Sequence, residues 1–221
     1  MENEIQFLIL CARTRLDPLA EKKIRDLMKD GINWQMVLAK AIKEKILPLV
    51  FFNICKLSLT REIPEAILSE FNRMNYGNLG QNIAIYQELK NLLRLFNEAG
   101  IEVIVLKGAA YIERLYDKNI GLRSIGDIDL VIKDADLSAA KKLLADAGYL
   151  QKSGWLEHPT IDFHHLVPFV NPKNNVIVEV HWTIAMYEKI FQLDMNKVWQ
   201  RAQKYKLGAF DMLILAPEDM I

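Results

Sequence analysis

The chain has 221 residues, of which 51% are hydrophobic and 25% charged, with 28 basic and 28 acidic side chains. This composition is that of a globular protein with a real core, and it excludes long disorder. The balanced charge argues against a protein that lives on a long polyanion. Two cysteines, Cys11 and Cys55, are too few for a disulfide framework and fit a reducing cytosol.

The N-terminus lacks the pattern of a secretory signal, because Glu2 and Glu4 precede the short apolar run at residues 7–10. No apolar run approaches the roughly 20 residues that a membrane helix needs. We therefore expect a soluble, cytoplasmic protein without a membrane partner.

Residues 1–99 have the periodicity of an all-helical domain. Helices are expected over residues 4–12, from Asp17-Pro18 to Gly31, after Asn33, after Pro48, and from Pro64 to Ala99. Gly77 and Gly80 weaken the last helix, where we expect a kink or a break. Because this region has no catalytic spacing, we expect it to shape the substrate entrance and to offer a surface to a protein partner.

A mixed region begins after Gly100. Strands are expected at 101–107, 127–132, 163–170, 176–182 and 210–215, and helices at 109–117, 136–147 and 194–203. This order predicts an α+β fold, with a mixed sheet covered by helices mainly on one face. Pro168 makes its strand an edge strand or a bulged one. Pro217 begins what reads as another helix, so we expect the protein to continue beyond Ile221 with further helices.

Asp127 and Asp129 lie two residues apart within an apolar strand. Because side chains alternate along a strand, both carboxylates point to the same face, where they repel each other. A divalent cation between them would offset that repulsion. Glu179, on the strand at 176–182, is the natural third carboxylate. The alternative is an edge strand with a solvated acidic face.

Gly108 falls where a strand turns into a helix, a place where free N–H groups and the helix dipole can hold a phosphate. Lys107 either adds positive charge for the phosphates or is the solvated end of the strand. Arg123, followed by Ser124, either reaches a phosphate or pairs with one of the acids and keeps it ionised. These four residues are the expected nucleotide-binding set.

All four histidines, His158, His164, His165 and His181, occur in one short window. Alternation puts His181 on the face of Glu179, and pairing of the two strands would bring His164 or His165 there too. A zinc site of two histidines and Glu179 lacks supporting ligand spacing. We expect instead that one histidine, His165 or His181, contacts the substrate or carries a proton.

The order of these motifs resembles the nucleotidyltransferases of the DNA polymerase β superfamily. The chain is most similar to an uncharacterised bacterial branch that combines Leu106-Lys107-Gly108, an Arg shortly before Gly126-Asp127-Ile128-Asp129-Leu130, and Glu179-x-His181-Trp182. The resemblance extends to Cys11–Leu16 and to Pro217-Glu218-Asp219, and so covers nearly the whole chain. It implies a helical domain at 1–99 and a polymerase β-like nucleotidyltransferase core at 100–221.

The resemblance also implies an activity, the transfer of a nucleoside monophosphate from an NTP such as ATP to a hydroxyl group, with release of pyrophosphate. Asp127 and Asp129 would hold the nucleotide-bound Mg²⁺ or Mn²⁺, and Asp129 with Glu179 would complete a second metal position. Glu179 would also take the proton of the attacking hydroxyl. Lys107-Gly108 departs from the superfamily's usual Gly-Ser or Gly-Gly, which removes a hydroxyl that often contacts the terminal phosphates.

The acceptor stays open among a small molecule, a peptide or protein, and an RNA end. Two rival functions also remain. One is a catalytically inactive module that binds nucleotides or a partner protein, and the other is a metal-dependent phosphohydrolase that uses the histidines.

Overall fold

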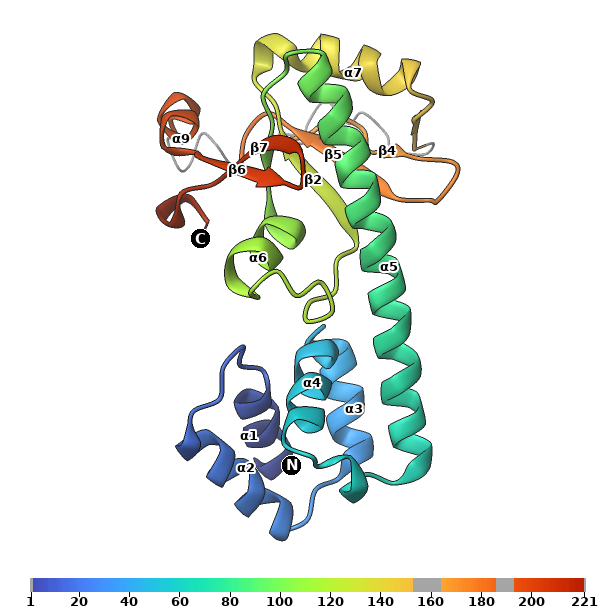
Figure 1. Ribbon diagram of the computed structural model, residues 1–221, viewed down its shortest axis with the longest axis vertical. Coiled ribbons are helices and arrows are strands. Elements are labelled where there is room, and N and C mark those ends of the chain that lie inside the picture. The colour runs from blue at the N-terminus through green and yellow to red at the C-terminus, as the bar shows by residue number, and fades with distance from the viewer. Residues whose placement is uncertain (1, 153–163, 186–192, 221) are drawn as a thin grey trace. The chain divides into compact units, whose positions relative to one another are not determined.

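A computed structural model of the chain describes residues 2–152, 164–185 and 193–220 (Figure 1). The chain divides into two compact units. One comprises Met1–Ile83 and Ile112–Ser124, and the other comprises Ala84–Tyr111 and Ile125–Ile221. Two helices, α5 (Glu65–Glu98) and α6 (Lys107–Leu115), contribute to both units. The units therefore do not correspond to the expected domains 1–99 and 100–221, and that division remains a prediction.

The first unit is helical in its N-terminal part. Its helices are α1 (Glu2–Cys11), α2 (Pro18–Lys29), α3 (Trp34–Lys43), α4 (Leu47–Lys56), the short 3₁₀ helix η1 (Thr60–Glu62) and the first part of α5. Asp17 and Asn33 cap α2 and α3, since their side chains accept from backbone N–H groups three residues on, at 2.7 and 3.0 Å. The apolar faces meet in one core, which includes Phe7, Trp34, Val50, Ile54 and Phe71.

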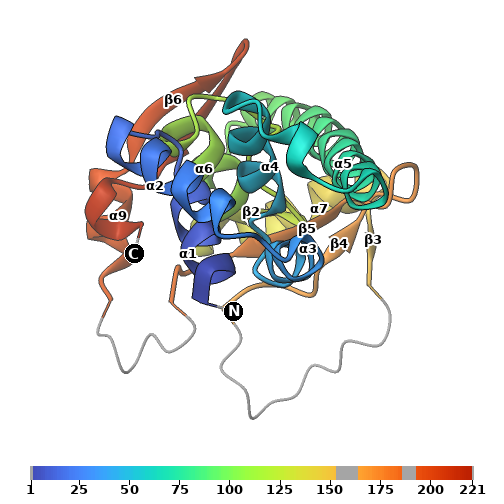
Figure 2. The ribbon, with the colours of Figure 1, turned by 90° about the horizontal axis from the view of Figure 1, so that it is seen from below.

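The second unit contains a seven-stranded mixed sheet. Its strands are β1 (Ile104–Val105), β2 (Asp127–Val131), β3 (Leu150–Gln151), β4 (Phe169–Val170), β5 (Ile177–His181), β6 (Gln203–Leu207) and β7 (Phe210–Ile214), in the order β3-β4-β5-β2-β1-β7-β6. Strand β2 is central, antiparallel to β1 and parallel to β5. Figure 2 shows β2, β5 and β4 side by side. The fold class expected from the sequence is therefore confirmed.

The second half of α5 extends across this sheet. At one point Glu88 accepts hydrogen bonds from Asn171 and Asn174 in the turn between β4 and β5, at 2.7 and 2.8 Å. Nine residues later, Asn97 exchanges two 2.9 Å hydrogen bonds with the backbone of Asp211 in β7. Helix α7 (Leu137–Asp146), which follows the 3₁₀ helix η2 (Asp134–Asp136), lies beside α5 (Figures 1 and 2).

Helix α9 (Met195–Arg201) packs its buried Val198 against Ile104 of β1, Val131 of β2 and Leu215, which directly follows β7. The 3₁₀ helix η3 (Pro217–Asp219) follows β7. Among the described residues no helix combines the length and the hydrophobicity needed to cross a bilayer.

The break considered for α5 is not found, because the helix runs without interruption through Gly77 and Gly80. Each glycine costs about 1 kcal/mol relative to alanine in a helix interior. Buried side chains on both sides outweigh that cost. Phe71 belongs to the core of the first unit, while Leu89 and Phe96 are fully buried in the second.

The strand expected at 163–170 is only partly confirmed. Residue 163 lies outside the described residues, and strand β4, which pairs with β5, contains only Phe169 and Val170. The strand is not an edge strand, since β4 lies between β3 and β5. The short strands β3 and β6 were not expected, and helix α6 begins two residues earlier than expected, at Lys107.

Candidate functional site

The pairing of β2 with β5 determines where the three expected carboxylates lie. In this parallel ladder Asp129 is the direct partner of Glu179, and Asp127 is the partner of Ile177. Paired residues of neighbouring strands point to the same face of a sheet, and residues two apart on one strand do so as well. All three carboxylates therefore lie on one face, while Ile128 and Val178 are buried on the other.

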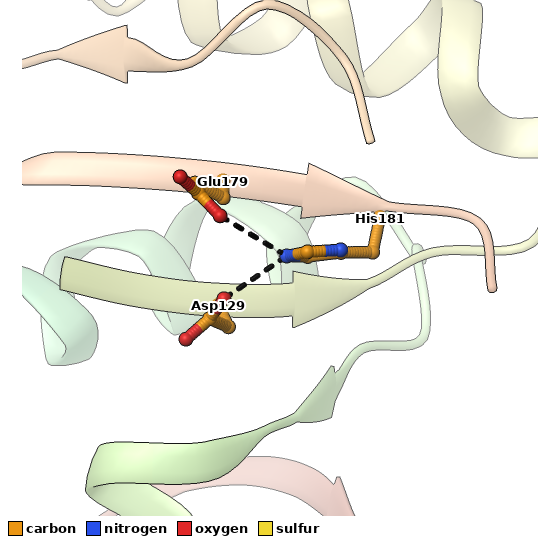
Figure 3. A group of neighbouring side chains, drawn as sticks. All are labelled: Asp129, Glu179 and His181. Atoms are coloured by element: carbon orange, nitrogen blue, oxygen red, sulfur yellow. Dashed lines mark hydrogen bonds and ion pairs between the residues drawn. The ribbon is translucent and has the colours of Figure 1, made fainter. Parts of the chain in front are cut away.

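His181 ends β5 and turns its ring back toward the two paired acids. Its Nε2 lies 3.0 Å from Oδ1 of Asp129 and 3.5 Å from Oε2 of Glu179, as Figure 3 shows. The His181 side chain is 1% exposed, that of Asp129 3%, and that of Glu179 20%. The imidazole nitrogen is therefore held between two carboxylates, largely out of water.

Lys107 brings a second cation to the same carboxylate. It follows β1 and is the first residue of α6, and its Nζ lies 2.6 Å from Oδ1 of Asp129. Its backbone φ is +43°, a conformation that costs a non-glycine residue roughly 1–3 kcal/mol. The Lys107 side chain is 54% exposed, so its ammonium already contacts solvent. It can therefore leave Asp129 and bind another anion without rearrangement of the core.

Gly108 occupies the first turn of α6, where the early N–H groups of a helix have no partner within the helix. An added Cβ at this position would lie 2.8 Å from Cγ2 of Ile125, closer than side-chain contacts allow. Glycine is therefore required by the close approach of Ile125, the residue two positions before Asp127. The same contact holds the start of α6 close to the segment that leads into β2.

The electrostatics of the cluster reflect the crowding of negative charge. Burial raises the pKa of Asp127, and the charges of Asp129 and Glu179 raise it further. Burial alone would raise the pKa of Asp129, but hydrogen bonds from His181 and Lys107 outweigh it and lower the value. The pKa of Glu179 is lowered chiefly by its hydrogen bond with His181. Hydrogen bonds from Lys107 and His181 thus favour the ionised form of Asp129, and the bond with His181 favours that of Glu179, whereas burial and the neighbouring charges disfavour that of Asp127.

The donor atoms of this cluster fit a divalent cation. One atom each from Asp129, Glu179 and His181 lie within 4.8 Å of one another, and Asp127 adds a carboxylate on the same face. Carboxylate oxygens and imidazole nitrogen are common ligands of divalent metals. The cluster can therefore hold a metal ion at the centre of the sheet.

A bulge beside β4 brings His165 to this face. His165 is bridged to His181, whereas Phe169 pairs with Val178, so the register shifts by one residue between the two pairs. Such a bulge inverts the alternation of side chains. Consequently His165 lies on the face of His181 while Phe169 is buried on the opposite face. The bulge expected near Pro168 is confirmed.

The rings of His164, His165 and His181 lie 4.9 to 5.1 Å apart. Burial, together with the neighbouring histidines, lowers the pKa of His164 to about 4, so this ring is neutral at pH 7. His165 Nδ1 lies 2.7 Å from the carbonyl oxygen of Leu166. His158 lies outside the described residues.

The structure thus brings together most of the expected site residues in the second unit: Lys107, Gly108, Asp127, Asp129, Glu179, His165 and His181. Arg123 and Ser124 belong to the first unit, and their nucleotide-binding role stays a prediction. Sequence reasoning missed that Lys107 and His181 both contact Asp129. The only available signal was the alternation that places His181 two residues after Glu179.

Comparison with known proteins gives one match. A family model described as "uncharacterised nucleotidyltransferase" matches residues 30–221, a range that contains every residue of the cluster. No curated protein and no solved structure matches the chain.

Proposed function

Because the chain belongs to a family of uncharacterised nucleotidyltransferases, we propose that it transfers a nucleoside monophosphate from an NTP to a hydroxyl of an acceptor and releases pyrophosphate. The observation that carries this proposal is the pairing of Asp129 with Glu179 on adjacent parallel strands, with Asp127 on the same face. Three converging carboxylates on a sheet suit metal-assisted displacement at a phosphorus atom.

The residues take distinct parts in this reaction. Asp127 and Asp129 would hold the metal that accompanies the nucleotide, and Asp129 with Glu179 would hold a second one. Bound Mg²⁺ or Mn²⁺ would neutralise charge on the attacking and leaving oxygens. Glu179 is the most exposed of the acids that contact His181, and it would accept the proton of the acceptor hydroxyl.

Lys107 and Gly108 would bind the triphosphate. The N–H groups at the start of α6 can donate hydrogen bonds to a phosphate. The Lys107 ammonium, which lies 2.6 Å from Asp129, would pair with the Asp129 carboxylate before the nucleotide binds and with a phosphate afterwards. Exchange of Lys107 from the carboxylate to a phosphate oxygen would free Asp129 Oδ1 for a cation. Arg123 and Ser124 would add contacts to the nucleotide, and His165 would contact the substrate.

The proposal is tested by incubating the full chain with each labelled NTP, with Mg²⁺ or Mn²⁺ and a cell extract, and by identifying what becomes labelled. We expect pyrophosphate release and a labelled small molecule, protein or RNA. Glu179→Gln should lower the rate of pyrophosphate release about 10²- to 10⁴-fold. Glu102→Gln, which changes an exposed acid in the same unit, is the matched control.

A second function is favoured by one observation. Lys107 and His181 already occupy the carboxylate of Asp129, as expected of a module that binds a nucleotide or a partner protein without turnover. That function predicts that the protein binds NTP without releasing pyrophosphate. It also predicts that Asp129→Ala leaves the biological function of the protein intact. Release of inorganic phosphate without any acceptor would instead indicate a phosphohydrolase.

A further inference from the structure

His181 contributes a nitrogen donor to a group that is otherwise made of oxygens. Its Nε2 is aimed between Asp129 and Glu179, within 3.5 Å of both carboxylates (Figure 3). We propose that His181 is itself a metal ligand, together with Asp129 and Glu179, and that this position takes a first-row transition ion such as Mn²⁺ in preference to Mg²⁺. The inference rests on the proposed function only in assuming that the cluster binds a metal.

The distances within the cluster suit coordination. Ligand atoms about 2.1 Å from a metal lie about 3.0 Å apart in adjacent octahedral positions and about 3.4 Å apart in a tetrahedron. The Nε2 to Oδ1 distance is 3.0 Å and the Nε2 to Oε2 distance is 3.5 Å. The two distances from Nε2 are thus already those of neighbouring metal ligands, and all three atoms lie within 4.8 Å of one another.

The three ligands are also held in place before any cation arrives. The ladder places the backbones of Asp129 and Glu179 opposite each other, and the contacts of His181 Nε2 with both carboxylates hold their side chains. The His181 ring is enclosed by the rings of His164 and His165, each about 5.1 Å away. Since little side-chain freedom remains to be lost, binding costs little conformational entropy.

The donor set predicts which ions bind best. Mg²⁺ takes oxygen ligands almost exclusively and keeps several waters, whereas imidazole favours transition ions. A site with two carboxylates and one imidazole should therefore discriminate between Mn²⁺ and Mg²⁺ more strongly than the carboxylates alone would. Lys107, which shares Oδ1 of Asp129 with His181, must yield when the ion binds, and its exposure allows this.

The experiment uses the full chain with Mn²⁺ alone. Titration followed by electron paramagnetic resonance gives the affinity, and electron spin echo modulation detects a directly bound ¹⁴N nucleus. In the wild type we expect bound Mn²⁺ with imidazole ¹⁴N coupling. His181→Gln should lose that coupling and bind Mn²⁺ at least tenfold more weakly, with a smaller change for Mg²⁺. His164→Gln, which changes the neighbouring ring, should retain the coupling. Glu102→Gln, which changes an exposed acid of the same unit, should retain both the coupling and the affinity.

Three results would overturn the inference: no Mn²⁺ binding by the wild type, bound Mn²⁺ without ¹⁴N coupling, or coupling that persists in His181→Gln. If His181→Gln fails to fold by circular dichroism, His181→Asn takes its place in the same measurements. The Mn²⁺ titration contains no nucleotide. Its outcome therefore does not depend on whether the protein releases pyrophosphate. Conversely, Mn²⁺ bound by oxygens alone would refute the role of His181 and leave nucleotidyl transfer standing.

Discussion

Asp129 and Glu179 are direct register partners on two parallel strands, and one imidazole nitrogen contacts both. If the two carboxylates hold the same cation, loss of either removes the same step. We therefore expect Asp129→Asn and Glu179→Gln each to reduce pyrophosphate release about as much as the double variant does. Rates of pyrophosphate release, with circular dichroism to verify folding, provide the check. Losses that multiply in the double variant would mean that the two residues act independently.

Lys107 should weaken metal binding and strengthen nucleotide binding. Its ammonium competes with a cation for Oδ1 of Asp129, so Lys107→Ala should raise the affinity for Mn²⁺. The gain should be about fivefold at most, because a half-exposed ion pair contributes about 1 kcal/mol or less. The same variant should bind NTP more weakly in equilibrium dialysis. Lys206→Ala, which removes an exposed lysine paired with Asp211, is the control and should change neither affinity.

Gly108→Ala should destabilise the protein, although alanine normally stabilises a helix interior. The new Cβ would meet Ile125 Cγ2 at 2.8 Å, and overpacking of this kind costs about 1–3 kcal/mol. Urea unfolding measures the change. Since Ile125→Ala removes the clashing methyl, the double variant should cost less than the sum of the two single variants. Gly126→Ala should be nearly neutral, because within the described part of the chain no atom lies within 4 Å of the new Cβ.

Sequence alone predicted those parts of the site in which strand alternation decides the geometry. Asp127 and Asp129 had to share a face, and Glu179 joined them once β5 paired with β2 in register. The contact of Lys107 with Asp129 could not be predicted, because it joins side chains 22 residues apart and Lys107 has a positive φ that no local pattern requires. Strand alternation also could not predict on which face of the sheet His165 lies, because that depends on a one-residue bulge.

The fold shows the same division between local and long-range information. The amphipathic helices and the apolar strands were predicted because their periodicity is local. Strand β6 was missed because its alternating lysines suit an exposed edge and weaken the apolar signal. The uninterrupted course of α5 was missed because packing of residues far along the chain outweighs the local cost of two glycines.

That cost predicts a stabilising change. Gly77 and Gly80 lie inside α5, and no atom of the described residues lies within 4 Å of a Cβ added at either. Gly77→Ala and Gly80→Ala should each raise the free energy of unfolding by about 1 kcal/mol, measured by urea unfolding followed by circular dichroism. Gly148→Ala is the contrasting variant. Its φ of +89° is unfavourable for alanine, so it should lower stability. No gain at Gly77 or Gly80 would mean that α5 is not helical there in solution.

The buried carboxylate of Glu88 predicts a loss of stability in acid. Glu88 is 1% exposed and accepts hydrogen bonds from Tyr149, Asn171 and Asn174. Burial alone would raise its pKa, but these hydrogen bonds outweigh that effect and lower the pKa below its usual 4.5. The ionised form is therefore favoured by folding. Its contribution is complete above about pH 4.5 and disappears as the pH falls through the lowered pKa of the folded state.

We expect Glu88→Gln to cost about 2–3 kcal/mol at pH 7, because the buried donors then lose a charged acceptor. The difference from the wild type should shrink below about pH 4.5, as Glu88 takes up a proton first in the unfolded state and then, at its lower pKa, in the folded state. Urea unfolding at pH 7 and at about pH 3 measures both values. Glu98→Gln removes an exposed acid from the same helix and should change stability by less than about 0.5 kcal/mol at either pH. A Glu88→Gln cost that is independent of pH would show that the carboxylate is not ionised in the folded protein.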